Sequence, residues 1–160
     1  MSTFYLNKTD DRGRGGGGGM TMVEMVVVFG VIGILALATI PAFRVFQPNL
    51  ELSSAARDLA TDLRYAQQLA VTEQVEHGIY FSTTTNEYQI IRFGAIEEIL
   101  ETKELPDKVS FQEVLGFTGY RVKFNPYGAA QESGNIALIN TKNSTTTVEV
   151  RPSGFVKIIK

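Results

Sequence analysis

The chain opens with a polar stretch and continues into its longest run without a charge. Residues 1–19 carry three basic and two acidic side chains and end in five glycines. Such a segment buries too little apolar surface to offset the entropy lost on ordering. From Met25 to Phe43 no residue is charged, and a helix of that length covers about 28 Å, enough to cross the core of a bilayer. The pattern predicts an unstructured leader, 1–19, and a membrane-spanning helix over 20–43.

The order of these segments differs from that of a secretory signal peptide. In such a peptide, the apolar region is followed by a cleavage site of small residues. Here the small residues end at Gly19, before the apolar run, and no Ala-x-Ala site follows it. We therefore expect the helix to stay in the mature protein. Arg12 and Arg14 lie close to the membrane and favour a cytoplasmic N-terminus, which would place the rest of the chain outside.

Beyond Arg44 and Pro48, apolar residues recur at spacings of three and four, the period of an amphipathic helix. We expect this segment, 44–77, to continue the helix, with Asn49, Ser53 or Ser54 available to cap a restart after Pro48. The apolar stripe is predicted to pack on the chain's own sheet. A self-associating coiled coil is the alternative, which the short, half-alanine stripe disfavours. The stripe comprises Leu52, Ala56, Leu59, Leu63, Ala66 and Ala70.

From residue 78 to 160 the apolar period changes to two, and turn residues separate short runs of β-forming residues. The strongest hairpin signal is Pro152-Ser153-Gly154, which lies between two such runs. The predicted fold class is α+β, a long N-terminal helix packed on an antiparallel β-sheet or β-sandwich domain. The predicted strands are 79–82, 88–93, 96–101, 109–114, 120–125, 135–141, 146–151 and 155–159.

Composition excludes several kinds of chemistry. With 15 Lys and Arg against 17 Asp and Glu, the chain has a net charge of −2. This charge argues against a protein that binds nucleic acid by neutralising its phosphates along a whole basic face. It has no Cys, and His77, expected at the end of the helix, is its single histidine. These counts exclude a disulfide framework, a thiolate nucleophile and a cysteine zinc site. Composition alone leaves carboxylate-only metal binding open. Because the chain shows no recognisable catalytic or metal-binding motif either, we expect a protein that is not an enzyme and has no metal or cofactor.

Two features remain as candidate sites, a cluster of acidic residues and the run of five glycines. Five acidic residues are interrupted by a single lysine, but they lack the spacing of an EF-hand loop, so a solvated strand face and turn is the better interpretation. The glycine run is not preceded by a strand or followed by a Lys-Ser or Lys-Thr pair, which argues against a phosphate loop. It fits a flexible site that a protease can reach. The acidic residues are Glu97, Glu98, Glu101, Glu104 and Asp107.

Glu24 stands at the start of the apolar segment. An ionised carboxylate inside hydrocarbon costs about 2.5–3.5 kcal/mol on insertion scales. Such a residue needs an oppositely charged partner, unless it lies at the depth of the lipid headgroups, where most of the cost vanishes. Position alone leaves both interpretations open.

The residues around Glu24 resemble a known signal. Gly19-Met20-Thr21-Met22-Val23-Glu24, followed by the uncharged run and Pro41, is similar to the class III signal of type IV pilins and type II secretion pseudopilins. The resemblance implies that a prepilin peptidase cuts between Gly19 and Met20 and methylates the amine of Met20. The glycine run also allows a cut after Gly18. It further implies that Glu24 pairs with the N-terminal ammonium of a neighbouring subunit during assembly.

Later segments resemble the FimT/GspH branch of minor pseudopilins and minor pilins. They are Leu59-x3-Leu63-Arg64-x-Ala66-x3-Ala70, the turn 124–128 and the closing Val148-x-Val150-x3-Gly154-x-Val156. The resemblance implies a structural subunit of a type II secretion pseudopilus, anchored in the bacterial inner membrane by a single pass with its globular domain in the periplasm. Its partners would be prepilin peptidase, major and minor pseudopilins or pilins, and secreted proteins.

Two other functions compete with that one. A minor type IV pilin would take part in pilus assembly or in DNA uptake, with DNA held near the C-terminus by Arg151, Lys157 and Lys160. A membrane-anchored periplasmic binding module would keep residues 1–19 and would not polymerise.

Overall fold

The structure is a computed structural model that describes residues 20–159, with the side chains of residues 38–45 excepted. The expected leader, 1–19, and Lys160 lie outside the described residues. The chain divides into two compact units, Met1–Ile40 and Pro41–Lys160, and one helix, α1 (Met22–Glu73), contributes to both.

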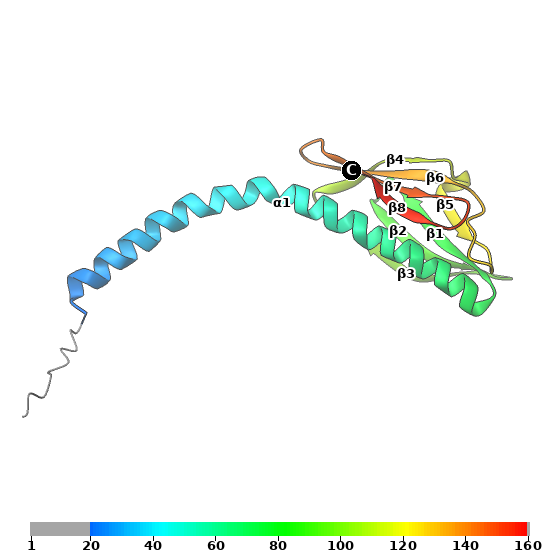
Figure 1. Cartoon of the computed structure of the whole chain (residues 1–160), viewed down its shortest axis with the longest axis horizontal. Coiled ribbons are helices and arrows are strands. Elements are labelled where there is room, and N and C mark those ends of the chain that lie inside the picture. The colour runs from blue at the N-terminus through cyan, green and yellow to red at the C-terminus, as the bar shows by residue number, and fades with distance from the viewer. Residues whose placement is uncertain (1–19, 160) are drawn as a thin grey trace, which may run out of the picture. The chain divides into compact units, whose positions relative to one another are not determined.

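Eight strands follow the helix and form two antiparallel sheets of four (Figure 1). The first sheet has the order β3-β2-β1-β5 and the second the order β4-β6-β7-β8. Each of the eight predicted strands is confirmed, with its ends moved by a few residues, and so is the predicted hairpin between β7 and β8. The strands are β1 (Glu76–Ser82), β2 (Glu87–Phe93), β3 (Glu97–Glu104), β4 (Val109–Leu115), β5 (Arg121–Phe124), β6 (Gly134–Asn140), β7 (Thr145–Val150) and β8 (Val156–Ile159).

The second half of α1 and the two sheets share one hydrophobic core. All six residues of the predicted stripe are buried, together with Ala55 and Ala60 on the same side of the helix. Polar bonds tie the helix to the second sheet: Asn140 of β6 donates to Asn49 over 2.8 Å, and Arg64 donates to the carbonyl of Val156 in β8 over 3.0 Å. The stripe therefore packs on the chain's own sheets, as predicted, and the coiled-coil alternative is wrong because the sheets cover this surface.

The helix differs from expectation at two points. It shows no restart at Pro48 and runs unbroken to Glu73; packing from Leu52 onward compensates for the hydrogen bond that proline cannot donate. It also ends four residues before His77, which lies fully buried in β1 instead of at a helix terminus. Gln74, with a φ of 56°, marks the end of the helix.

The membrane-spanning expectation concerns the apolar run 25–43. No helix among the described residues is long and apolar enough to cross a membrane. The side chains of residues 38–43, the last part of that run, lie outside the described residues.

Candidate functional site

The first turn of α1 is built around Thr21 and Glu24. The hydroxyl of Thr21 accepts a hydrogen bond from the backbone N–H of Glu24 over 3.2 Å, so Thr21 is the N-cap of the helix. The Glu24 side chain lies in the first turn, where a carboxylate is favoured by the partial positive charge of the helix N-terminus. The Thr-x-x-Glu spacing thus gives the helix a defined start at Met22, two residues after Met20.

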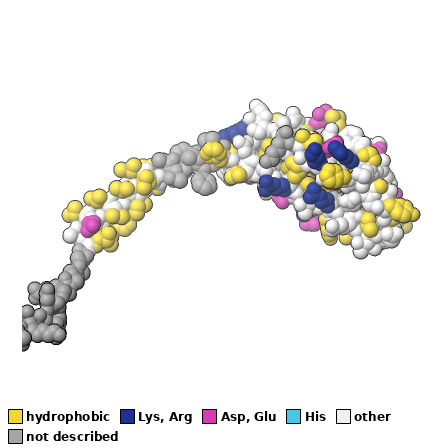
Figure 2. Space-filling model, viewed as in Figure 1, with side chains coloured by type: hydrophobic (Ala, Val, Ile, Leu, Met, Phe, Trp, Pro, Cys, Tyr) yellow, Lys and Arg dark blue, Asp and Glu magenta, His cyan; other side chains and the backbone are white. Residues whose placement is uncertain are grey.

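This part of α1 presents apolar side chains to solvent. From Met20 to Leu37 every described residue is exposed, including Met22 at 85%, Phe29 at 67% and Leu37 at 75%. Glu24 is the only charged residue in this range, and Figure 2 shows that hydrophobic side chains predominate on this part of the helix. A continuous apolar surface with one carboxylate is unusual for a soluble protein and marks a surface that another molecule covers.

The structure places the predicted signal residues as follows. Gly19 lies outside the described residues, Met20 is exposed, and Glu24 is exposed with no side-chain hydrogen bond or ion pair to the described part of the chain. Glu24 is therefore available to a partner from elsewhere. Cleavage, methylation and pairing stay predictions.

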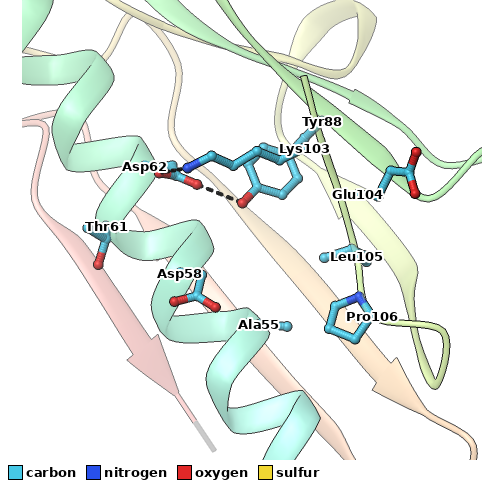
Figure 3. A pocket seen from close by; sticks show the side chains of 9 residues that line it. All are labelled: Ala55, Asp58, Thr61, Asp62, Tyr88, Lys103, Glu104, Leu105 and Pro106. Atoms are coloured by element: carbon cyan, nitrogen blue, oxygen red, sulfur yellow. Dashed lines mark hydrogen bonds and ion pairs between the residues drawn. The ribbon is translucent and has the colours of Figure 1, made fainter. Parts of the chain in front are cut away.

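A polar cleft of about 480 Å³ lies between α1 and β3 (Figure 3). At its back, the buried carboxylate of Asp62 accepts hydrogen bonds from the Tyr88 hydroxyl over 2.7 Å and from Lys103 Nζ over 2.8 Å. Tyr88 belongs to β2 and Lys103 to β3, so one side chain of the helix binds two strands of the first sheet. We call these three residues the Asp62 triad.

Contact with Asp62 favours the protonated forms of Tyr88 and Lys103. Burial, together with the hydrogen bond to Asp62, raises the pKa of Tyr88 far above its usual range, so the hydroxyl stays protonated. The same carboxylate raises the pKa of Lys103. Each oxygen of Asp62 accepts a hydrogen bond from one of these two donors, which holds the carboxylate between the helix and the first sheet. The triad is thus a structural connection and not a catalytic group.

The sequence offered a partial signal for the triad. Asp62 lies three residues after Leu59 and four before Ala66, which puts it beside the buried stripe of the helix. Its partners are distant in sequence, so only the pairing of β2 with β3 brings them to the helix.

The acidic residues around β3 are solvent exposed, as predicted. Glu97 forms an ion pair with Arg121 over 2.8 Å, and Glu98 lies 3.7 Å from Arg92. Among the described residues, no group of three or more histidine or acidic side chains is placed to hold a metal ion.

The basic residues near the C-terminus lie at the edge of the second sheet. Arg151 forms an ion pair with Glu149 over 3.3 Å and stacks on the ring of Phe155 at 5.9 Å. Lys157 lies opposite Glu149 in the β7–β8 ladder, and Lys160 is outside the described residues. One carboxylate thus offsets part of the charge of both described cations.

Comparisons with known proteins agree on the fold. The minor pseudopilin EpsH from the type 2 secretion system of Vibrio cholerae is similar over 68% of this chain and 96% of its own, with a TM-score of 0.60 and 11% identity. The type IV minor pilin FimU of Pseudomonas aeruginosa matches over 72% of this chain and 92% of its own, with a TM-score of 0.57 and 16% identity.

The solution structure of Escherichia coli GspH matches over 69% of this chain and 89% of its own, with a TM-score of 0.55 and 15% identity. No curated protein matches the sequence. The model of the family described as Type II transport protein GspH matches residues 55–154, well over half of the chain. These residues hold the buried stripe from Ala55 onward and seven complete strands, and the chain belongs to the GspH family.

Proposed function

We propose that this protein is a minor pseudopilin of a type II secretion system, which joins a pseudopilus through the N-terminal half of α1 and supports protein export. Members of the GspH family are structural subunits and not enzymes. The observation that carries the proposal is the uncovered apolar surface of residues 20–37 with Glu24 as its only charge. A bundle of such helices would cover that surface in the assembled filament.

Before assembly, the same surface would lie in the bacterial inner membrane. In this proposal the N-terminus is cytoplasmic, the sheet domain is periplasmic, and prepilin peptidase cuts between Gly19 and Met20 and methylates the amine of Met20. The cut would leave the new ammonium four residues from Glu24, at the well-defined start of the helix. Other pseudopilins would be the partners of the helix, and secreted proteins those of the sheet domain.

Glu24 supplies the registration of the subunits. An unpaired carboxylate is costly in an apolar bundle, and the ammonium of a neighbouring Met20 relieves that cost only at one axial position of the helices. The side chain has no internal partner among the described residues, which leaves it free for this contact. The pair would therefore select one register between neighbouring subunits.

The test compares Glu24→Gln with Glu24→Asp in cells that express the full chain with the other subunits of its system. Glu24→Gln keeps the size of the side chain but removes its charge, so we expect normal cleavage and membrane insertion without incorporation into sheared filaments. Glu24→Asp keeps the charge and should restore part of the incorporation. Incorporation of Glu24→Gln at the level of the unmodified chain would disprove the pairing role.

The second candidate is a minor type IV pilin that takes part in pilus assembly or DNA uptake. The likeness to FimU supports the pilus system as much as the likeness to EpsH supports secretion. For DNA, the favourable observation is the exposed ring of Phe155 with Arg151 stacked on it, a pairing of aromatic and cationic groups that suits single strands.

That candidate is tested by titrating single-stranded DNA into the purified chain at two salt concentrations. Binding that weakens with salt and with Lys157→Ala would support DNA uptake. Binding that is absent at low salt would exclude DNA as a ligand of this surface.

A further inference from the structure

The two sheets have four edge strands, β3 and β5 in the first sheet and β4 and β8 in the second. An edge strand presents unpaired N–H and C=O groups, to which another strand can add. Proteins therefore cover most of their edges. How each edge of this domain is covered distinguishes one strand from the other three.

Three of the edges receive a hydrogen bond from another segment of the chain. On β8, the carbonyl of Val156 accepts from Arg64 over 3.0 Å. On β5, the carbonyl of Lys123 accepts from the N–H of Gln131 over 2.9 Å. On β4, the N–H of Phe111 donates to the side chain of Asn86 over 3.2 Å. Within the described residues, β3 has no such contact on its outer edge.

The backbone of β3 is open toward solvent. The strand is eight residues long, and all of them are exposed except the half-buried Lys103. The N–H of Leu105 donates to the carbonyl of Asn86 over 2.9 Å, directly across the β2–β3 ladder. Hydrogen-bonded and non-bonded pairs alternate along an antiparallel ladder. The N–H and C=O groups of Thr102 and Glu104 therefore point away from β2, where an added strand would bind them.

The side chains of β3 specify the kind of strand that fits. The strand carries four glutamates and one lysine, Lys103, whose ammonium is bound to Asp62. Glu97 and Glu98 are partly neutralised by Arg121 and Arg92, and Glu101 lies 3.6 Å from Lys103, whereas Glu104, at the outward-facing end of the strand, forms no ion pair with the described residues. Exposed apolar groups lie beside them: Ile96 is 85% exposed and Ile99 57%, and both line a hollow of about 780 Å³. Pairing of β3 with the β3 of a second copy would bring like charges together, which is unfavourable.

We propose that β3 is a docking edge, to which an extended segment of a different polypeptide, rich in Lys or Arg and interspersed with aliphatic residues, adds as a fifth strand of the first sheet. Backbone hydrogen bonds would supply part of the affinity, and the glutamates would select the basic segment. This contact is separate from assembly through α1, so its failure would leave the proposed function intact.

A fragment comprising residues 46–160 is suitable for the test. The whole hydrophobic core lies between Leu52 and Val156, and the solved EpsH chain matches over 96% of its length while covering only 68% of this one. A solved chain of this fold therefore corresponds to about two thirds of the present one, and the fragment keeps the whole core. The fragment also lacks the apolar surface of residues 20–37, which would associate on its own.

The probe is a synthetic peptide of alternating Lys and Val, matched in length to β3, and the control peptide has Glu in place of Lys. Amide hydrogen exchange is followed by NMR. We expect the Lys peptide to slow exchange at Thr102 and Glu104 by about tenfold or more, in a manner that weakens with salt, and the Glu peptide to leave it unchanged. Equal protection by both peptides, or by neither, would overturn the proposal.

Two variants separate an edge contact from binding elsewhere. Thr102→Pro removes an outward-facing N–H that the β2 ladder does not use, which is a position where proline is tolerated; it should abolish protection by the Lys peptide. Glu104→Lys, which does not alter the backbone, should weaken the Lys peptide and admit the Glu peptide. Undiminished protection in either variant, or a concentration-dependent dimer with slow exchange along β3 in the absence of peptide, would contradict a basic strand as the occupant.

Discussion

Replacement of Asp62 by alanine tests the connection between the helix and the first sheet. In the folded chain, Asp62 is 7% exposed, and its carboxylate accepts hydrogen bonds from the Tyr88 hydroxyl and from Lys103. Asp62→Ala leaves the hydroxyl of the buried Tyr88 without an acceptor, which costs about 1.5–3 kcal/mol for a hydrogen bond to a charged group. Lys103 is 35% exposed, so water screens its ion pair and that part adds only about 0.5 kcal/mol.

We therefore expect Asp62→Ala to lower the free energy of unfolding by about 2–3.5 kcal/mol. Urea unfolding of the 46–160 fragment, followed by far-ultraviolet circular dichroism, measures this as a lower midpoint at constant slope. Asp58→Ala is the matched control, because Asp58 is an exposed aspartate one turn earlier on the same helix, and its change should stay within about 0.5 kcal/mol.

A double-mutant cycle assigns the loss to its partners. Tyr88→Phe removes the donor, so the effect of Asp62→Ala should be smaller by about 1 kcal/mol or more in that background. Equal losses for Asp62→Ala and Asp58→Ala, or effects of Asp62→Ala and Tyr88→Phe that simply add, would refute the interpretation of the triad.

Three further predictions concern the same fragment. Leu63→Ala, at a fully buried position of the stripe, should cost about 3–5 kcal/mol in urea unfolding, and a loss under about 1 kcal/mol would contradict its place in the core. Gly154→Ala should cost about 2 kcal/mol or more, because φ is +78° and a Cβ would collide with a neighbouring carbonyl, whereas Gly119→Ala, with a φ of +64° and open space around it, should cost about 1 kcal/mol. Alkaline pH should destabilise the fold, because the pKa values of Tyr88 and Lys103 are raised above their ordinary 10.0 and 10.5. The folded chain therefore keeps protons that the unfolded chain releases. The stabilisation from these two groups is complete below pH 10.0 and falls as the pH rises beyond it, and Tyr88→Phe should reduce this fall.

Local pattern was sufficient to predict much of the sheet domain. The strands alternate apolar and polar residues, and their turns carry residues suited to positive φ, such as Asn86, Gly128 and Gly154. The stripe from Leu52 to Ala70 predicted both the helix and the face that it buries. These features are local, because period and turn chemistry depend on residues close together in sequence.

Features that depend on distant residues were missed. The Asp62 triad joins positions 26 and 41 residues apart, and the sequence shows each member only as a common polar residue. The sequence predicts His77 at the end of the helix, but His77 and Gly78 both lie within β1. A Cβ at Gly78 would collide with the backbone of Val122 in the neighbouring strand β5. That glycine serves the close approach of two strands, a requirement that no local pattern expresses. The open outer edge of β3 is likewise a feature of the tertiary structure, because other segments of the chain bond to the edges of β4, β5 and β8 but, among the described residues, not to that of β3.

The intact mass of the protein isolated from the membranes of its own host tests the central proposal most directly. A minor pseudopilin that assembles through α1 must have been cut and modified at the start of this helix. We predict a mass that corresponds to residues 20–160 with one added methyl group, and fragmentation that places this group on Met20. A protein that retains residues 1–19 would contradict the account and favour an anchored periplasmic module that does not polymerise.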